Sequence, residues 1–289
     1  MDHQGIIIRP PSEVNSIILQ VTRGCSHNKC TFCGTYRGQR FKIKSNDIID
    51  ADIDFAARYC RNQRRLFICD GDGLIIPQRR LTALLEKIKM RLPWVTRVGI
   101  YANTKSIAMK SAKALAELQR LGLGIVYMGL ESGDDQTLKR IRKGADAARM
   151  ITAGRKVRQA GIKLSLTVLL GVAGRERSAI HARETGRVLS AIDPEYVGAL
   201  SLMLIPGTPL HADLDAGRFA LIEPREMLME LGIMLAHTHM TNGLFHANHA
   251  SNYLPIRARL PGDQEKTLQL INRALDGEIQ LKPEYLRAL

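Results

Sequence analysis

The stretch Arg23-Gly24-Cys25-Ser26-His27-Asn28-Lys29-Cys30-Thr31-Phe32-Cys33-Gly34 holds three of the five cysteines of this 289-residue chain. Three thiolates this close together can hold an iron–sulfur cluster that leaves one iron without a protein ligand, because such clusters normally take four cysteines. A zinc ion would need a fourth Cys or His, and His27 lies inside the short loop from Cys25 to Cys30, where reaching the same metal would be strained. We therefore predict that Cys25, Cys30 and Cys33 hold one cluster with an open iron.

Composition places the chain among soluble globular proteins, since 45% of its residues are hydrophobic and 24% are charged. No stretch approaches the ~20 apolar residues that span a bilayer, and the N-terminal residues lack the pattern of a secretory signal. Five cysteines, three of them clustered, suit a reducing compartment better than a disulfide framework. We expect a cytoplasmic protein with no membrane partner.

The chain is strongly basic, with 42 Lys and Arg residues against 28 Asp and Glu residues and a formal net charge of +14. This charge favours anionic partners, either nucleic acid or small molecules with phosphate or carboxylate groups. Only 5% of the residues are aromatic, so no platform for stacking single-stranded bases is visible. We expect a small-molecule substrate, which the charge suggests is anionic, and regard nucleic acid as an open but less favoured partner.

Short apolar runs alternate with helical patterns along most of the chain, which predicts an α/β fold with a parallel sheet. Six such units would form an incomplete barrel, which we write as a partial (β/α)6 barrel over residues 16–210. Residues 1–15 form an N-terminal extension, and residues 211–289 form a mostly helical and loop extension that closes the barrel mouth. The predicted strands are 16–21, 65–69, 97–101, 125–130, 163–170 and 196–204.

Small and acidic residues follow successive predicted strands, where the active sites of parallel α/β folds gather. The cysteine loop follows the first strand, and four further groups follow the next four: Asp70-Gly71-Asp72-Gly73, then Asn103, then Glu131-Ser132-Gly133, then Gly171-Val172-Ala173-Gly174-Arg175-Glu176. Each group alone has an ordinary structural explanation, such as a turn or a helix cap. Their order and spacing predict that they line one mouth.

From about Ile17 to Leu210 the chain resembles the radical S-adenosylmethionine (radical SAM) enzymes. That superfamily commonly carries Cys-x3-Cys-x2-Cys with an aromatic residue before the last Cys, and this chain has Cys25-x4-Cys30-x2-Cys33 with Phe32 in that place. The first gap is one residue longer than usual. The segments 129–144, 170–176 and 205–210 are similar to the branch that includes oxygen-independent coproporphyrinogen oxidases, methylthiotransferases and the elongator catalytic subunit.

The resemblance implies one [4Fe–4S] cluster and SAM as cofactors, with the amino and carboxylate groups of SAM on the open iron. Asp72 would receive the SAM ammonium, Glu131 would face the ribose or the amino-acid end, and Arg142 or Lys143 would meet the carboxylate. The residues from 170 to 176 resemble the adenine-side motif. The residues expected to contact the cofactors are Phe32, Asp70, Gly71, Asp72, Asn103, Glu131, Ser132, Arg142, Lys143, Gly171 and Val172.

Beyond Leu210 the resemblance fades. An amphipathic helix is predicted over 226–240 and a final helix over 264–275, and between them the polar segment 241–255 shows little helix or strand pattern. We take this segment as a loop that contacts substrate through His246, His249, Asn252 and Tyr253. Paired His residues here could suggest a second metal, although scattered His side chains are more often structural or substrate-binding.

The function that these features predict is reductive cleavage of SAM at the cluster, yielding a 5′-deoxyadenosyl radical that acts on an unidentified substrate. An electron donor such as flavodoxin or ferredoxin would reduce the cluster. A tRNA-modifying radical SAM enzyme is the enzymatic alternative, favoured by the net charge. An alternative of another class is a non-catalytic iron–sulfur sensor or nucleic-acid-binding regulator. Cys60 and Cys69 are expected to be core thiols.

Overall fold

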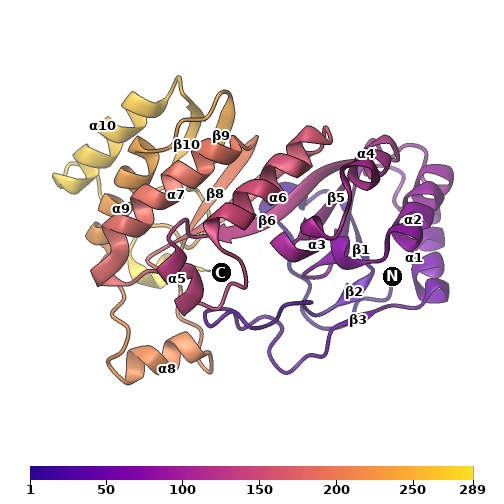
Figure 1. Ribbon diagram of the computed structural model, residues 1–289, viewed down its shortest axis with the longest axis horizontal. Helices are drawn as coiled ribbons and strands as arrows, with labels where there is room; N and C mark the ends of the chain where they lie inside the picture. The colour runs from indigo at the N-terminus through magenta and orange to yellow at the C-terminus, as the bar shows by residue number, and fades with distance from the viewer. Residues whose placement is uncertain (289) are drawn as a thin grey trace. The chain divides into compact units, whose positions relative to one another are not determined.

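The computed structural model of the protein describes residues 1–288 (Figure 1). Its strands are β1 (Ile17–Gln20), β2 (Thr22–Arg23), β3 (Lys42–Ile43), β4 (Arg65–Cys69), β5 (Arg97–Ala102), β6 (Leu123–Glu131), β7 (Lys163–Leu170), β8 (Tyr196–Ser201), β9 (Gly243–His246) and β10 (Arg257–Leu260). Its helices are α1 (Asn46–Tyr59), α2 (Gln78–Arg91), α3 (Thr104–Ala108), α4 (Ala112–Arg120), α5 (Asp135–Arg140), α6 (Ala147–Gln159), α7 (Ser178–Ile192), α8 (Pro209–Asp215), α9 (Pro224–Ala236) and α10 (Gln264–Leu275). Short 3-10 turns are η1 (Pro11–Glu13), η2 (Gly73–Ile75), η3 (Arg175–Arg177) and η4 (Glu284–Leu286).

The main sheet has eight strands in the order β1-β4-β5-β6-β7-β8-β9-β10, and β2 pairs with β3 in a separate ribbon. The end strands of the main sheet are β1 and β10, so within the described residues the sheet is open rather than a closed barrel. Strands and helices alternate through β8, as predicted. The fold is therefore an α/β partial barrel. Two compact units make up the described chain, and each is considered separately below.

Unit 1 comprises residues 1–28, 35–128 and 156–164. Its strands β1, β4, β5 and the first part of β6 pair in parallel, with Leu66 opposite Ile17 on one side and Val98 on the other. The apolar run from Leu66 to Ile68 is fully buried, as is typical of a parallel strand covered on both faces. Helix α1 packs against β1 and α2, and α2 packs against α4.

A buried glutamate of the N-terminal segment accepts hydrogen bonds from two strands of unit 1. Glu13, in η1, is fully buried and accepts hydrogen bonds from Ser16, from Tyr127 of β6 and from Arg97, the first residue of β5. Because Arg97 begins its strand, this cluster lies at the end of β5 opposite to the loop that carries Asn103. The N-terminal segment is thus tied into the sheet by a charged cluster.

Unit 2 comprises residues 29–34, 129–155 and the described residues from 165 onward. Strand β7 pairs in parallel with β8, β8 with β9, and β10 runs antiparallel to β9. Helix α7 packs against α9, and α9 packs against α10; Figure 1 shows α7 in coral, α9 in orange and α10 in yellow. These three helices form one layer, and residues of α7 and α9 contact the loops that follow β6 and β7, as described below.

The structure differs from the predicted elements in several places, of which one bears on the expected substrate loop. Between β5 and β6 the chain forms two short helices, because Asn103 caps α3 in a capping box and Ser111 caps α4 three residues after α3 ends. The segment 241–255, expected to be loop, contains β9, which adds a further parallel strand beside β8. That prediction was wrong because a four-residue strand with two fully or nearly buried positions shows too short an alternation to detect, and its partner lies far away in sequence.

The two cysteines outside the cluster stretch differ in burial. Cys69 ends β4 and is fully buried, and burial raises the pKa of its thiol, so it is a core thiol as predicted. Cys60 follows α1 and is half-buried, with its thiol pKa also raised by burial. Neither thiol has the low pKa of a reactive cysteine.

Candidate functional site

Asp72 lies just beyond β4 and is the most deeply buried acid of the predicted mouth in unit 1. Its side chain is 0% exposed; Oδ2 accepts hydrogen bonds from Ser26 Oγ at 2.5 Å and from Asn103 Nδ2 at 2.8 Å. Its Oδ1 is also buried and meets no donor in good hydrogen-bond geometry among the described residues, although the Ser106 hydroxyl and the backbone N–H groups of Asn103 and Ile75 lie near enough to the carboxylate to lower its pKa. Burial raises the pKa of Asp72 to about 6, although the hydrogen bond from Ser26 acts to lower it. The structure therefore brings together the loop of Cys25, the end of β4 and the end of β5.

Asp70, two residues earlier, serves the fold. Its Oδ1 accepts a hydrogen bond from the Tyr36 hydroxyl, and its Oδ2 accepts from the backbone N–H of Gly24 at 3.3 Å and from Gln20 Nε2 at 3.5 Å. Burial raises its pKa, while these donors lower it. Both oxygens have partners within the chain, so Asp70 fixes the start of the cysteine loop, and its expected contact with a cofactor stays a prediction.

Gly71, between the two acids, has no space for a side chain. A Cβ there would lie 2.8 Å from the Tyr36 ring and 3.1 Å from Cys25 Cβ. The backbone after β4 therefore passes directly against Cys25. A larger residue at Gly71 would displace that cysteine.

The second half of the cysteine loop belongs to unit 2. The backbone N–H of Thr31 donates to Ile141 O, Leu210 N–H donates to Thr31 O, and Cys33 N–H donates to Cys30 O. Phe32 and Cys33 are half-buried. The segment is thus held from both sides by backbone hydrogen bonds, one to the end of α5 and one to the start of α8.

At the end of β6, Glu131 and Lys143 form an ion pair. Glu131 Oε1 lies 2.9 Å from Lys143 Nζ, and the two side chains are only 11% and 14% exposed. Glu131 adopts a left-handed backbone conformation with φ of 63°, which is uncommon for a residue other than glycine. Arg142 also has a positive φ and is exposed. Of the two cations expected at a carboxylate, Lys143 is the one beside Glu131.

Ser132, Gly171 and Val172 are all buried in unit 2. Ser132 Oγ lies 2.8 Å from His181 Nδ1 and accepts a hydrogen bond from Asp134 N, so its hydroxyl is engaged within the chain. Gly171 has a φ of 80°, a conformation that favours glycine, and its N–H donates to Glu230 Oε1 at 2.7 Å. These residues support the strand ends rather than offering free polar atoms.

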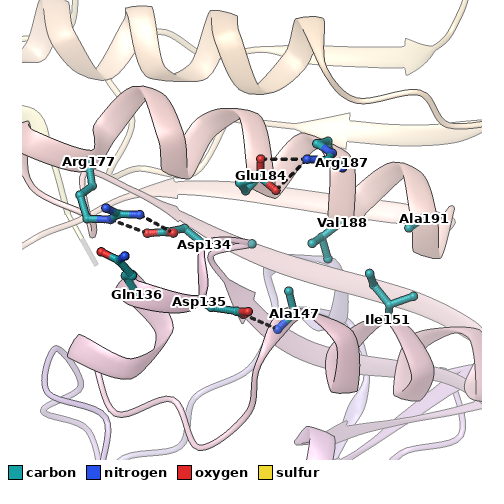
Figure 2. A pocket seen from close by; sticks show the side chains of 11 residues that line it. Asp134, Asp135, Gln136, Ala147, Ile151, Arg177, Glu184, Arg187, Val188 and Ala191 are labelled. Carbon is teal, nitrogen blue, oxygen red and sulfur yellow. Dashed lines mark hydrogen bonds and ion pairs between the residues drawn. The ribbon is translucent and has the colours of Figure 1, made fainter.

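A pocket of about 500 Å³ opens beside the Ser132 loop (Figure 2). Two ion pairs stand at its edge: Arg177 forms a bidentate pair with Asp134 at 2.7 and 2.8 Å, and Arg187 contacts Glu184 at 3.1 Å. Burial acts to raise the pKa of Asp134, but hydrogen bonds from Arg177 and Thr137 outweigh it and lower the pKa to about 2. The remaining lining residues are Gly133, Asp135, Gln136, Ala147, Ile151, Val188 and Ala191.

The four residues expected to contact substrate divide into two pairs. Asn252 is buried, and it accepts a hydrogen bond from Ser201 Oγ and donates one to Ala199 O. Tyr253 donates to Glu284 and accepts from Arg287. The polar groups of Asn252 and Tyr253 are engaged within the fold, and contact of these two residues with substrate stays a prediction.

His246 and His249 are half-buried, and burial is the main cause of the lowered pKa of each ring. His246 ends β9, and His249 Nδ1 lies 2.9 Å from Ser251 Oγ. Within residues 1–288, no group of three or more His, Cys, Asp and Glu side chains is arranged to hold a single metal ion. The three thiolates of a cluster bind separate iron atoms and need not meet at one point.

Several residues that the site uses were not singled out from the sequence. Ser26 and Tyr36 hold the two acids after β4, and the buried Lys110 donates to Ile76 O while lying within electrostatic reach of Asp72. Ser26 could have been noticed, because it sits between two cysteines. The others lie in segments whose sequence carries no signal of their contacts.

Comparison with known proteins agrees with this geometry. The model of the radical SAM superfamily matches residues 19–182, more than half of the chain. An uncharacterized protein of Methanocaldococcus jannaschii is 22% identical, with 81% of this chain and 75% of that protein covered. The cobalamin-dependent S-adenosylmethionine radical enzyme OxsB, solved with aqua-cobalamin and S-adenosylmethionine bound, superposes with a TM-score of 0.58 at 16% identity, covering 76% of this chain and 40% of that one. Coproporphyrinogen III oxidase of Escherichia coli superposes with a TM-score of 0.55 at 13% identity, covering 76% of this chain and 51% of that one.

The chain belongs to the radical SAM superfamily, and it is an enzyme of that class. The cofactors of the class are a [4Fe–4S] cluster and SAM, and SAM is bound in the OxsB structure. This chain spans about 40% of OxsB and about half of the coproporphyrinogen oxidase, so the likeness to them shows the fold alone. No helix among the described residues is long and apolar enough to cross a membrane.

Proposed function

We propose that this enzyme cleaves SAM reductively at a [4Fe–4S] cluster held by Cys25, Cys30 and Cys33, and that it acts on an anionic small molecule. When bound, the cluster and SAM supply an electron and a 5′-deoxyadenosyl radical, which takes a hydrogen atom from the substrate. The chain's own residues would bind and orient the cofactor.

The observation that carries this proposal is the buried oxygen of Asp72 that has no well-aligned hydrogen bond. A buried carboxylate oxygen without a well-aligned hydrogen bond is costly, and a bound ligand is one arrangement that would satisfy it. The other oxygen is fixed by Ser26 and Asn103, so the carboxylate is already oriented before any ligand arrives. An ammonium group, such as that of SAM, has the charge and the hydrogen-bond donors that this oxygen lacks.

The remaining residues would contact different parts of the cofactor. Lys143, already oriented by Glu131, supplies a fixed positive charge for a carboxylate, and Glu131 supplies an acceptor for hydroxyl or ammonium donors. By the resemblance of residues 170–176 to the adenine-side motif, Gly171 and Val172 would lie on the adenine side of the cofactor. The half-buried His246 and His249 remain candidates for contact with substrate, because their lowered pKa values keep them neutral and able to accept hydrogen bonds at pH 7.

The partners and the location of the enzyme follow from its sequence. A flavodoxin or a ferredoxin would deliver the electron, and the net charge of +14 would attract acidic proteins of this kind as well as an anionic substrate. A cytoplasmic location suits an oxygen-sensitive cluster. Residues 1–15, 16–210 and 211–289 are proposed to serve as N-terminal extension, barrel and mouth-closing extension.

The test is anaerobic reconstitution with iron and sulfide, reduction with dithionite and addition of SAM. We expect SAM to change the electron paramagnetic resonance (EPR) spectrum of the reduced cluster and 5′-deoxyadenosine to be released, with neither result in the Cys33→Ala variant. A wild-type cluster whose EPR spectrum SAM leaves unchanged, with no 5′-deoxyadenosine released, would refute the proposal and favour an iron–sulfur sensor.

A tRNA substrate is the second candidate, and the net charge is what favours it. Binding of tRNA that weakens linearly with the logarithm of salt concentration, together with SAM cleavage stimulated by tRNA, would support this candidate. Cleavage that tRNA leaves unchanged would support the small-molecule substrate.

A further inference from the structure

A buried His–Glu pair joins α7 to α9 in unit 2. His181 and Glu230 are both 0% exposed at their side chains, and His181 Nε2 lies 3.4 Å from Glu230 Oε1. Removing a carboxylate from water costs several kcal/mol, about as much as its partners give back. A pair of this kind therefore contributes little net stability, which is consistent with a second role.

On the histidine side, the pair reaches the loop after β6. His181 Nδ1 lies 2.8 Å from Ser132 Oγ and 3.3 Å from Thr185 Oγ1. Thr185 in turn accepts a hydrogen bond from Gly133 N at 2.8 Å, so two neighbouring residues of the loop are bound to one face of α7. Arg177, one turn before His181, adds the bidentate pair with Asp134.

On the glutamate side, the pair reaches the loop after β7. Glu230 Oε1 accepts the N–H of Gly171 at 2.7 Å, and Glu230 Oε2 accepts the hydroxyl of Ser178. The middle contact is electrostatic: His181 Nε2 faces Glu230 Oε1 at 3.4 Å but makes no hydrogen bond within the described residues. Ser132, His181, Glu230 and Gly171 therefore form a series of polar contacts between two strand ends, with hydrogen bonds at its two ends.

Space around the first loop leaves it little freedom. A Cβ at Gly133 would lie 2.3 Å from the backbone oxygen of Glu184 in α7, so the loop and the helix backbone are in direct contact. The residue before Ser132 is Glu131, whose left-handed backbone must be held by its surroundings. The polar contacts of His181 supply part of that restraint.

We propose that His181 and Glu230 are positioning residues that set the spacing between Glu131 and Gly171. This inference rests on the proposed function, in which these two loops meet opposite ends of SAM. The pair touches neither cofactor nor substrate. The pair holds one loop through Ser132 and the other loop through the N–H of Gly171, so that both loops contact one ligand at the same time.

The experiment measures the SAM dissociation constant of the reconstituted enzyme from the EPR change that SAM causes in the reduced cluster. Glu230→Gln keeps the size of the side chain but supplies only one accepting oxygen to Gly171 and Ser178. We expect iron content and the spectrum without SAM to stay at wild-type values, while SAM binds about tenfold more weakly. Glu184→Gln, an exposed carboxylate on α7, is the matched control, and its SAM affinity should equal that of the wild type.

A double-mutant cycle separates positioning from simple packing. Ser132→Ala and Glu230→Gln each break one end of the series of polar contacts from Ser132 to Gly171. If these contacts act as one unit, the double variant should bind SAM scarcely more weakly than either single variant. Effects that multiply, or a wild-type SAM affinity in Glu230→Gln, would overturn the inference.

Two further outcomes are distinguishable. If Glu230→Gln does not fold, Ser178→Ala replaces it in the cycle, since it removes one donor to the same carboxylate and leaves the charge. If the wild-type enzyme itself shows no response to SAM, the proposed function fails and the positioning inference falls with it, whereas a normal wild type with an unaffected variant refutes the positioning role alone.

Discussion

Glu131 Oε1 and Lys143 Nζ are 2.9 Å apart, and both atoms lie over the α-carbon of Gly129. A Cβ at Gly129 would come within 2.1 Å of the carboxylate oxygen and 2.8 Å of the ammonium nitrogen. The absence of a side chain at this position is therefore what gives the ion pair its place at the end of β6.

Gly129→Ala should weaken SAM binding while leaving the fold nearly unchanged. The clashing atoms are the far ends of two flexible side chains, so they can swing away at little cost, and we expect the free energy of unfolding to change by less than about 1 kcal/mol. The displaced pair would bind SAM several-fold more weakly. Denaturant unfolding and SAM titration of the same preparation check both parts, and a wild-type SAM affinity would remove the pair from the site.

Removing any one of the three clustered cysteines should abolish the cluster. In the wild type we expect about four iron atoms per chain after reconstitution. Cys25→Ala, Cys30→Ala and Cys33→Ala should each lose most of this iron, and Cys60→Ala should keep it. Iron analysis is the measurement, and a wild-type content near eight atoms would contradict a single cluster.

Substitutions of the two acids after β4 should have different effects. Asp72→Asn removes the charge from the oxygen that has no well-aligned hydrogen bond, so we expect SAM to bind about tenfold more weakly with the iron content unchanged. Asp70→Asn disturbs the hydrogen bonds from Tyr36 and Gly24, so we expect a lower melting temperature and poorer cluster assembly. Equal effects of the two variants on SAM binding would argue against this division.

The Asp134–Arg177 pair should contribute stability that depends on pH. The pKa of Asp134 is lowered from 3.8 to about 2, so its contribution is complete above about pH 5 and is lost as the pH falls through about 4 toward 2. At pH 7 we expect Asp134→Asn to cost about 1 to 2 kcal/mol of unfolding free energy, with the difference from wild type vanishing near pH 2. Asp146→Asn, at an exposed pair, is the control and should show little change.

Glu13 should be essential for the stability of unit 1. Glu13→Ala leaves Arg97 and Tyr127 without their buried acceptor, and we expect a loss of about 3 kcal/mol in unfolding free energy. Asp54→Ala, which breaks the half-exposed pair of Asp54 with Arg91, should cost less than about 1 kcal/mol. Thermal unfolding of the two variants under one condition decides between them, and comparable losses would mean that burial of Glu13 is unimportant.

Much of the architecture could be predicted from local pattern. The strand at 65–69 and the strand at 163–170 have the bounds expected from their sequence: the first is an almost continuous apolar run, and the second alternates polar and apolar residues before three apolar residues. Strand β9 could not be predicted, since it has four residues and gains its place from pairing with β8. Asp70 and Asp72 looked alike as acids at one strand end, and only their hydrogen-bond partners distinguish them.

The class of the enzyme could be inferred from the sequence, because the spacing of Cys25, Cys30 and Cys33 and the residues after successive strands are local features of the chain. Which polar groups are hydrogen-bonded within the fold depends on the tertiary structure. His181 lies 49 residues from Ser132, and Glu230 lies 59 residues from Gly171. Contacts over such separations exist only when α7 and α9 pack together, so no local pattern could reveal them.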